Sequence, residues 1–170
     1  MKTYKNYLGI GVIVFLLAAV IGILAISRPD VSDSSNNGLS AAAAVLLAAE
    51  EKAFDFGTVS MAAGKVNHVF KIRNATTDPI VVEKLYTSCM CTEASLVIDG
   101  KKTGPFGMAG HGFIPKINKT IAPGVEAAVE AVFDPAAHGP AGVGPIARVI
   151  YLEEAGGGVL ELNFSAVVEP

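Results

Sequence analysis

The sequence has only two cysteines, and they stand one residue apart in the TSCMCT segment of residues 87–92. Residues i and i+2 of an extended strand point to the same face, so we expect the thiols of Cys89 and Cys91 to face one small region. In that conformation the Cα atoms would lie near the upper limit for a disulfide, and a bridge would need a local bend. Three states stay open: a strained, easily reduced disulfide, two free and inert thiols, or two thiolates on a soft metal ion.

Further donors for such an ion lie in two loops rich in Gly and Pro. Met108 and His111 belong to the stretch 101–119, and His138 belongs to the stretch 134–145. Thiolate and thioether favour Cu(I), and imidazole suits copper generally. The sequence therefore predicts a copper site formed by Cys89, Cys91, Met108, His111 and His138. The donors come from three separate segments, so no local spacing specifies the site. Each loop histidine taken alone is better explained as a solvent-exposed or hydrogen-bonded residue than as a ligand.

Enzymatic chemistry has weaker support in this sequence. A Cys–His nucleophile pair could form between one cysteine and one loop histidine, but the third group that orients the imidazole in such sites has no clear candidate. The sequence has no phosphate-binding P-loop, no His-Glu-x-x-His zinc motif and no Cys-x-x-Cys-His haem motif. We therefore expect a binding protein rather than an enzyme.

The body of the chain alternates apolar and polar residues, which predicts strands that would position these donors. Alternation runs through 66–73, 125–133 and 160–168, and turn signals such as Asp99-Gly100 and Pro123-Gly124 separate the segments. About seven or eight short strands over residues 53–170 predict an all-β, immunoglobulin-like antiparallel β-sandwich, although a jelly roll or a cupredoxin-like barrel would give a similar pattern. His68 falls on the apolar face of its segment, so we interpret it as a hydrogen-bonded residue at the edge of the core.

The N-terminal part predicts a membrane anchor. Residues 8–26 form an uncharged apolar run preceded by Lys2 and Lys5, and about 20 such residues span a bilayer as a helix. The positive-inside rule then predicts a single-pass protein of the inner or cytoplasmic membrane, with residues 1–27 as cytoplasmic tip and transmembrane helix and the rest extracytoplasmic. A cleaved signal peptide is the alternative, although its apolar region would be shorter.

Between anchor and sandwich, residues 28–52 predict a linker. Its first part is rich in Ser, Asn and Asp, and its second part, AAAAVLLAAEEK at 41–52, predicts a short helix. The net charge of −3 is opposite to what phosphate binding needs, so nucleic acid is excluded as a partner.

Five short segments make the body similar to a bacterial Ig-like family of unknown function, the one numbered fifteen seventy-three among domains of unknown function. They read FDFGTV at 54–59, VFKIRN at 69–74, SCMCT at 88–92, IAPG at 121–124 and VFDP at 132–135. The family commonly has Gly where this chain has Met90, and the insertion with Met108 and His111 also departs from it. The resemblance covers residues 53–170 and implies an exported or membrane-anchored Ig-like domain, without implying an activity.

Two functions follow as hypotheses. The first is the binding of a soft metal, with copper as the candidate ion, for metal handling or electron transfer at the membrane surface. The second is a non-enzymatic interaction or envelope-assembly module that binds an envelope protein and carries a Cys89–Cys91 disulfide as a local brace.

Overall fold

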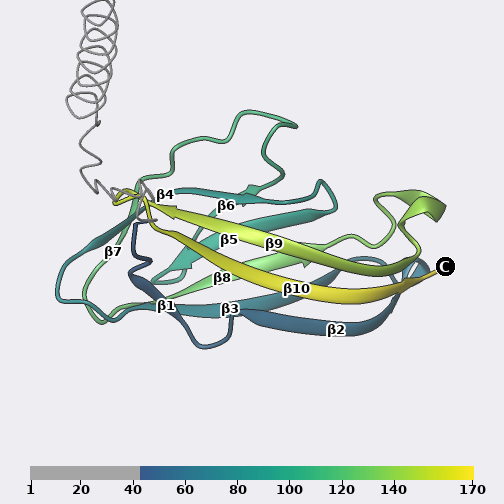
Figure 1. Cartoon of the computed structure of the whole chain (residues 1–170), viewed down its shortest axis with the longest axis horizontal. Coiled ribbons are helices and arrows are strands. Elements are labelled where there is room, and N and C mark those ends of the chain that lie inside the picture. The colour runs from purple at the N-terminus through teal and green to yellow at the C-terminus, as the bar shows by residue number, and fades with distance from the viewer. Residues whose placement is uncertain (1–42) are drawn as a thin grey trace, which may run out of the picture. The chain divides into compact units, whose positions relative to one another are not determined.

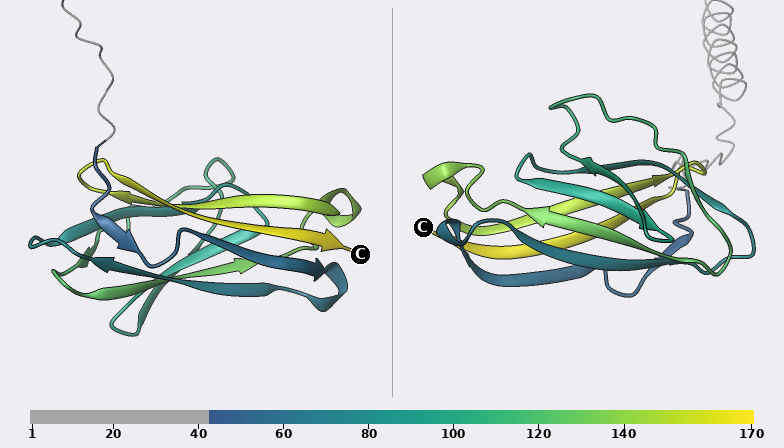
Figure 2. Two further views of the ribbon diagram at one scale, coloured as in Figure 1. Left: turned by 60° about the horizontal axis from the view of Figure 1, so that its bottom comes forward. Right: turned by 180° about the vertical axis from the view of Figure 1, so that it is seen from behind.

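The computed structural model describes residues 43–170, which form an all-β sandwich of two five-stranded sheets. The first sheet has the order β1-β3-β8-β5-β6, and the second has the order β2-β10-β9-β4-β7 (Figure 1). Figure 2 shows the two sheets lying face to face. In chain order the elements are β1 (Leu47–Ala49), β2 (Ala53–Ser60), the 3-10 turn η1 (Met61–Ala63), β3 (Val66–Asn74), β4 (Ile80–Thr87), β5 (Thr92–Ile98), β6 (Lys101–Phe106), β7 (Lys119–Ile121), β8 (Glu126–Phe133), the 3-10 turn η2 (Gly139–Gly142), β9 (Gly144–Glu154) and β10 (Val159–Glu169).

The strand pairing is antiparallel except at one place, where β2 runs parallel to β10. The longest ladder joins β9 to β10 through the turn at residues 155–158. These two strands form the centre of the second sheet, and β3 and β8 hold the equivalent place in the first.

The apolar residues of the alternating segments fill the space between the sheets, as the sequence predicted. Phe70 and Ile72 of β3 are buried, and so is every second residue of β8 from Ala127 to Phe133. In β10 the buried set runs from Leu160 to Val168 with the same period. Alternation thus assigned the inner faces correctly, because a sandwich strand has one face in the core and one in water.

His68 lies at the edge of this core, in agreement with the prediction. Its ring stacks on Phe54 with centroids 3.6 Å apart, and it meets Phe70 edge-on. Its Nε2 lies 2.6 Å from a carboxylate oxygen of Glu51. The aromatic contacts and the carboxylate account for His68 as a packing residue.

The predicted helix over 41–52 is wrong for the part of it that the structure describes. Residues 47–49 are instead strand β1, which pairs antiparallel with β3 and makes the sandwich begin before residue 53. Leu47 is only 3% exposed, so this edge strand covers the core with an apolar side chain. Pairing and burial against a distant strand outweigh the helix propensity of the alanines, which stabilises a short helix only weakly.

Glu154, at the end of β9, holds β1 in place. Its side chain is buried, and its carboxylate accepts hydrogen bonds from the backbone N–H groups of Leu46 and Leu47 at 2.9–3.0 Å. The two residues are more than a hundred positions away from Glu154 in the sequence. This carboxylate therefore ties the first strand of one sheet to the last turn of the other.

The predicted anchor, linker start and cytoplasmic tip lie outside the described residues. Within residues 43–170 there is no helix long and apolar enough to cross a membrane.

Replacement of Glu154 by Ala tests the tie between β1 and the second sheet. The change leaves backbone donors in a buried place without an acceptor, which costs about 1–3 kcal/mol. We expect the free energy of unfolding of the 170-residue chain, measured by equilibrium urea denaturation, to fall by that amount. Glu93→Ala on the exposed face of β5 is the control and should change it by less than about 0.5 kcal/mol. Equal effects of the two substitutions would contradict the assigned role.

Candidate functional site

Residues 88–91 form a turn between β4 of the second sheet and β5 of the first. The extended strand that the sequence predicted for the two cysteines is therefore corrected to a turn, closed by the N–H of Thr92 donating to the carbonyl of Cys89 at 3.1 Å. The turn brings the sulfur atoms of Cys89 and Cys91 to 2.7 Å from each other, with both cysteines free. Met90, between them, is 54% exposed.

Hydrogen bonds to both sheets hold the turn in place. The hydroxyl of Thr87, only 1% exposed, lies 3.0 Å from the carbonyls of both Cys89 and Thr92 and can donate to either. On the second sheet, Ser88 exchanges two hydrogen bonds of 2.9 Å with the backbone of Val149. On the first sheet, the N–H of Asp134 donates to the carbonyl of Cys91 at 2.9 Å. The sulfur positions are thereby fixed by the scaffold.

His138 reaches the same place from the segment between β8 and η2. Its Nε2 lies 3.1 Å from the sulfur of Cys89. The segment bends back through a turn in which Gly139 has a φ of +56°, and its N–H donates to Ala136. Gly142 passes so close that a Cβ there would stand 3.1 Å from the Cβ of His138. The glycines of this loop thus let the chain fold tightly behind the imidazole.

Arg148 of β9 completes the cluster, and the sequence analysis missed it. Its Nε donates to the sulfur of Cys91 at 3.2 Å, and its Nη1 donates to the carbonyl of Ala147 at 2.8 Å. One signal was present in the sequence: Arg148 is the only charged residue in the apolar run of residues 144–152. A lone arginine inside such a strand needs a partner, and here the partner is a thiol.

The surroundings of the two thiols make them unequal. Burial alone would raise the pKa of Cys89. Hydrogen bonds from the thiol and N–H of Cys91, the contact with His138 and the charge of Arg148 outweigh burial and lower this pKa to about 7. Burial and the Cys89 sulfur raise the pKa of Cys91, against the lowering effect of Arg148. Burial lowers the pKa of the Arg148 guanidinium, but the hydrogen bond to Cys91 and both sulfurs raise it by more, so it stays charged. Cys89 is therefore the first of the pair to become a thiolate.

Three of the five predicted ligands meet in this cluster. The sulfurs of Cys89 and Cys91 and a ring nitrogen of His138 all lie within 4.8 Å of one another, close enough to hold one metal ion. No Asp or Glu in residues 43–170 joins the group, and neither does His111, which lies exposed in the loop after β6. In Figure 1 that loop and the η2 segment are separate projections of the sandwich.

Met108 lies near the turn by its backbone. It forms an isolated bridge with Thr87, and the N–H of Thr87 donates to the carbonyl of Gly107 at 3.0 Å. This places the loop alongside the end of β4, just before the cysteines. The participation of the Met108 thioether as a ligand stays a prediction.

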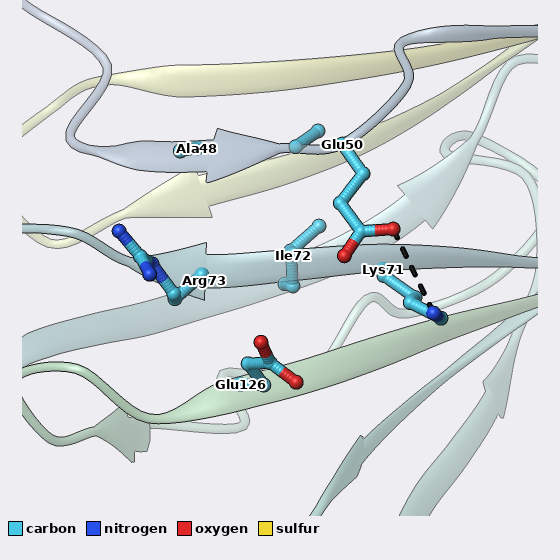
Figure 3. Close-up of a pocket in the computed structure, with 7 residues that line it drawn as sticks. Ala48, Glu50, Lys71, Ile72, Arg73 and Glu126 are labelled. Atoms are coloured by element: carbon cyan, nitrogen blue, oxygen red, sulfur yellow. Dashed lines mark ion pairs between the residues drawn. The ribbon is translucent and has the colours of Figure 1, made fainter.

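A second concave area lies away from the cysteines, on the outer face of β1, β3 and β8. Charged residues line it, and Figure 3 shows Glu50 paired with Lys71 across 3.7 Å, with Arg73 and Glu126 nearby. It holds no cysteine or histidine, and its charges neutralise one another. The cluster at the β4–β5 turn is therefore the candidate site.

Alkylation of the reduced, metal-free chain by iodoacetamide tests the inequality of the thiols. In the unmodified chain, with the label located on each cysteine by peptide mass spectrometry, the labelling rate of Cys89 should rise with pH through a midpoint of about 7, whereas an ordinary thiol has a midpoint of about 8.5. Cys91, whose pKa is raised by burial and by the Cys89 sulfur, should react only at higher pH. A midpoint for Cys89 at or above that of an ordinary thiol would contradict the assignment.

The fold is similar to that of several solved structures. A protein of unknown function from Porphyromonas gingivalis W83 matches with a TM-score of 0.53 and 17% identity, over 78% of this chain and 51% of that one. The secreted serine protease VesC from Vibrio cholerae matches with a TM-score of 0.48 and 13% identity, over 78% and 25% of the two chains. PapD-like domain 7 of human CEP192 matches with a TM-score of 0.44 and 13% identity, over 73% and 85%.

These likenesses concern the fold alone. The chain spans about half the length of the Porphyromonas protein and a quarter of the Vibrio protease. No curated protein sequence matches the chain. A family model does match: residues 47–105, the segment that includes both cysteines, correspond to the family described as "Protein of unknown function (DUF1573)". This confirms the family resemblance over those residues, while the similar segments at 121–124 and 132–135 lie outside the match.

Proposed function

We propose that this protein is a membrane-anchored, extracytoplasmic Ig-like domain that binds a soft metal ion, Cu(I), through Cys89, Cys91 and His138. The observation that carries the proposal is the meeting of two thiols and one imidazole within 4.8 Å. The uncharged run at residues 8–26 supports the anchor. The two sheets with alternating inward residues support the Ig-like assignment.

The donor set favours a soft ion. Thiolates select Cu(I) and Zn(II) over the hard cations, and imidazole suits both. Structural zinc sites take four protein ligands, one more than the Cys and His side chains gathered here. Cu(I) is satisfied by fewer, softer ligands. A pKa of about 7 makes the Cys89 thiolate available near neutral pH without much cost for losing its proton.

The position of the cluster favours transfer of the ion over permanent storage. Cys91 is buried, Cys89 is half-buried and His138 is exposed, so one side of the site is open to solvent. Structural metal sites are closed, whereas sites that exchange a ligand keep an open side. We therefore propose metal handling at the membrane surface, with an envelope protein as the partner that donates or accepts the ion.

A second candidate function rests on the closeness of the two sulfurs. A disulfide needs them at about 2.05 Å, and they already lie 2.7 Å apart. Oxidation of the two thiols to a disulfide would brace residues 88–91. The domain would then serve as a metal-free interaction module that binds an envelope protein. Exported proteins meet the oxidising conditions that this state needs.

Anaerobic titration with Cu(I), in competition with a Cu(I) chelator, tests the metal site on the reduced 170-residue chain. We expect one tight site per chain. Cys89→Ser and Cys91→Ser should each weaken it by at least about a hundredfold, and His138→Ala by about tenfold, since each removes a direct ligand. His111→Ala is the matched histidine control and should leave the affinity within about twofold. Met108→Leu shows whether the thioether contributes.

The same preparation separates the two candidates by its free-thiol count. Two free thiols with tight Cu(I) binding support the metal site. Two thiols oxidised to each other, with no Cu(I) binding after reduction, would contradict the metal proposal and support the interaction module.

A further inference from the structure

Arg148 is a fixed positive charge beside the proposed metal ligands, and no Asp or Glu in the described part of the chain forms an ion pair with it. None of the ion pairs found among residues 43–170 includes it. No carboxylate joins the cysteines and His138 either. The polar contacts of the guanidinium are the carbonyl of Ala147 and the sulfur of Cys91. Within residues 43–170, the thiol pair is thus the only group in contact with Arg148 that can carry a compensating negative charge.

We propose that Arg148 makes this site select monovalent soft cations, Cu(I) and its analogue Ag(I), over divalent Zn(II). The inference rests on the proposed function and adds the property that sets its metal specificity. Arg148 acts through the charge of the site and not as a ligand, because a guanidinium has no lone pair to offer a metal.

Charge counting gives the direction of the effect. Two thiolates and a neutral imidazole carry a charge of minus two, which one Cu(I) reduces to minus one. The guanidinium then brings the group to neutrality. With Zn(II) the thiolates are already neutralised, and the guanidinium leaves an uncompensated positive charge that repels the ion.

The repulsion is large because the groups are close and partly shielded from water. Arg148 Nε is 3.2 Å from a ligand sulfur, and Cys91 is buried. Charges at such separations interact several times more strongly at a partly buried site than in bulk water. Arg148 cannot relieve the repulsion by losing its proton, because a guanidinium stays charged at any physiological pH. The hydrogen bond to Ala147 also holds it where it is.

A role limited to packing would have a different signature. The loss of the Arg148 hydrogen bond could loosen Cys91 and so weaken every metal equally. The ratio of the Cu(I) and Zn(II) affinities of one variant cancels such damage. A change in that ratio therefore reports the charge, whereas a change in both affinities alone reports the packing.

The test measures Cu(I) and Zn(II) affinities of the full 170-residue chain and of Arg148→Gln and Arg148→Lys, each by competition with a chelator for that metal under reducing conditions. We expect Arg148→Gln to lower the Cu(I):Zn(II) affinity ratio by at least about tenfold. Arg148→Lys keeps the charge and should stay within about threefold of the unmodified chain. Arg73→Gln removes an exposed arginine of β3 that lines the separate concave area, and it should leave the ratio unchanged.

The outcomes separate this inference from the proposed function. If the unmodified chain binds Cu(I) tightly and Arg148→Gln lowers the Cu(I) and Zn(II) affinities equally, the selectivity role of Arg148 is wrong and the metal site is still supported. An unmodified chain that prefers Zn(II) also overturns the selectivity role. If it binds neither metal, the proposed function fails, and the selectivity of its site fails with it.

Discussion

The change of sheet between β4 and β5 is the constraint on which the site depends. The chain leaves one layer and enters the other within residues 88–91, and the buried hydroxyl of Thr87 lies 3.0 Å from the carbonyls of Cys89 and Thr92 and can donate to either. Because β4 and β5 are both packed in the core, the turn has no freedom to spread. The two sulfurs are therefore held close to each other by the packing of the two sheets.

Features that depend on neighbouring residues could be predicted from the sequence, whereas features that depend on contacts between distant residues could not. Alternation in β3, β8 and β10 depends on one core face and was predicted correctly. The helix expected at 41–52 was not formed, because Leu47 and Glu154 interact across more than a hundred residues. Cys89, Cys91 and His138 were predicted by residue type. His111 looked equally suitable, since only the three-dimensional course of a loop distinguishes it from His138.

Arg148 could not be predicted as part of the site from ligand chemistry. Arginine binds no metal, so a search for donors passes over it, although its place in an apolar strand was a physical anomaly visible in the sequence. A half-buried cation must have a counter-charge or pay for desolvation. In β9 that need is met by sulfur. The arginine in the strand and the buried thiol in the turn are thus partners in one contact.

Burial and the hydrogen bond between the two thiols explain why the cysteines are not equivalent. Cys89 faces the exposed imidazole and has its pKa lowered to about 7, whereas Cys91 lies inside and resists deprotonation. In the proposed site, Cys89 and His138 would be the ligands nearest to solvent, because both are more exposed than Cys91. Cys91 would be the inner ligand, and the guanidinium beside it would stabilise its thiolate form. The difference in burial would therefore divide the donor set into outer ligands that an ion reaches from solvent and an inner sulfur whose charge Arg148 balances.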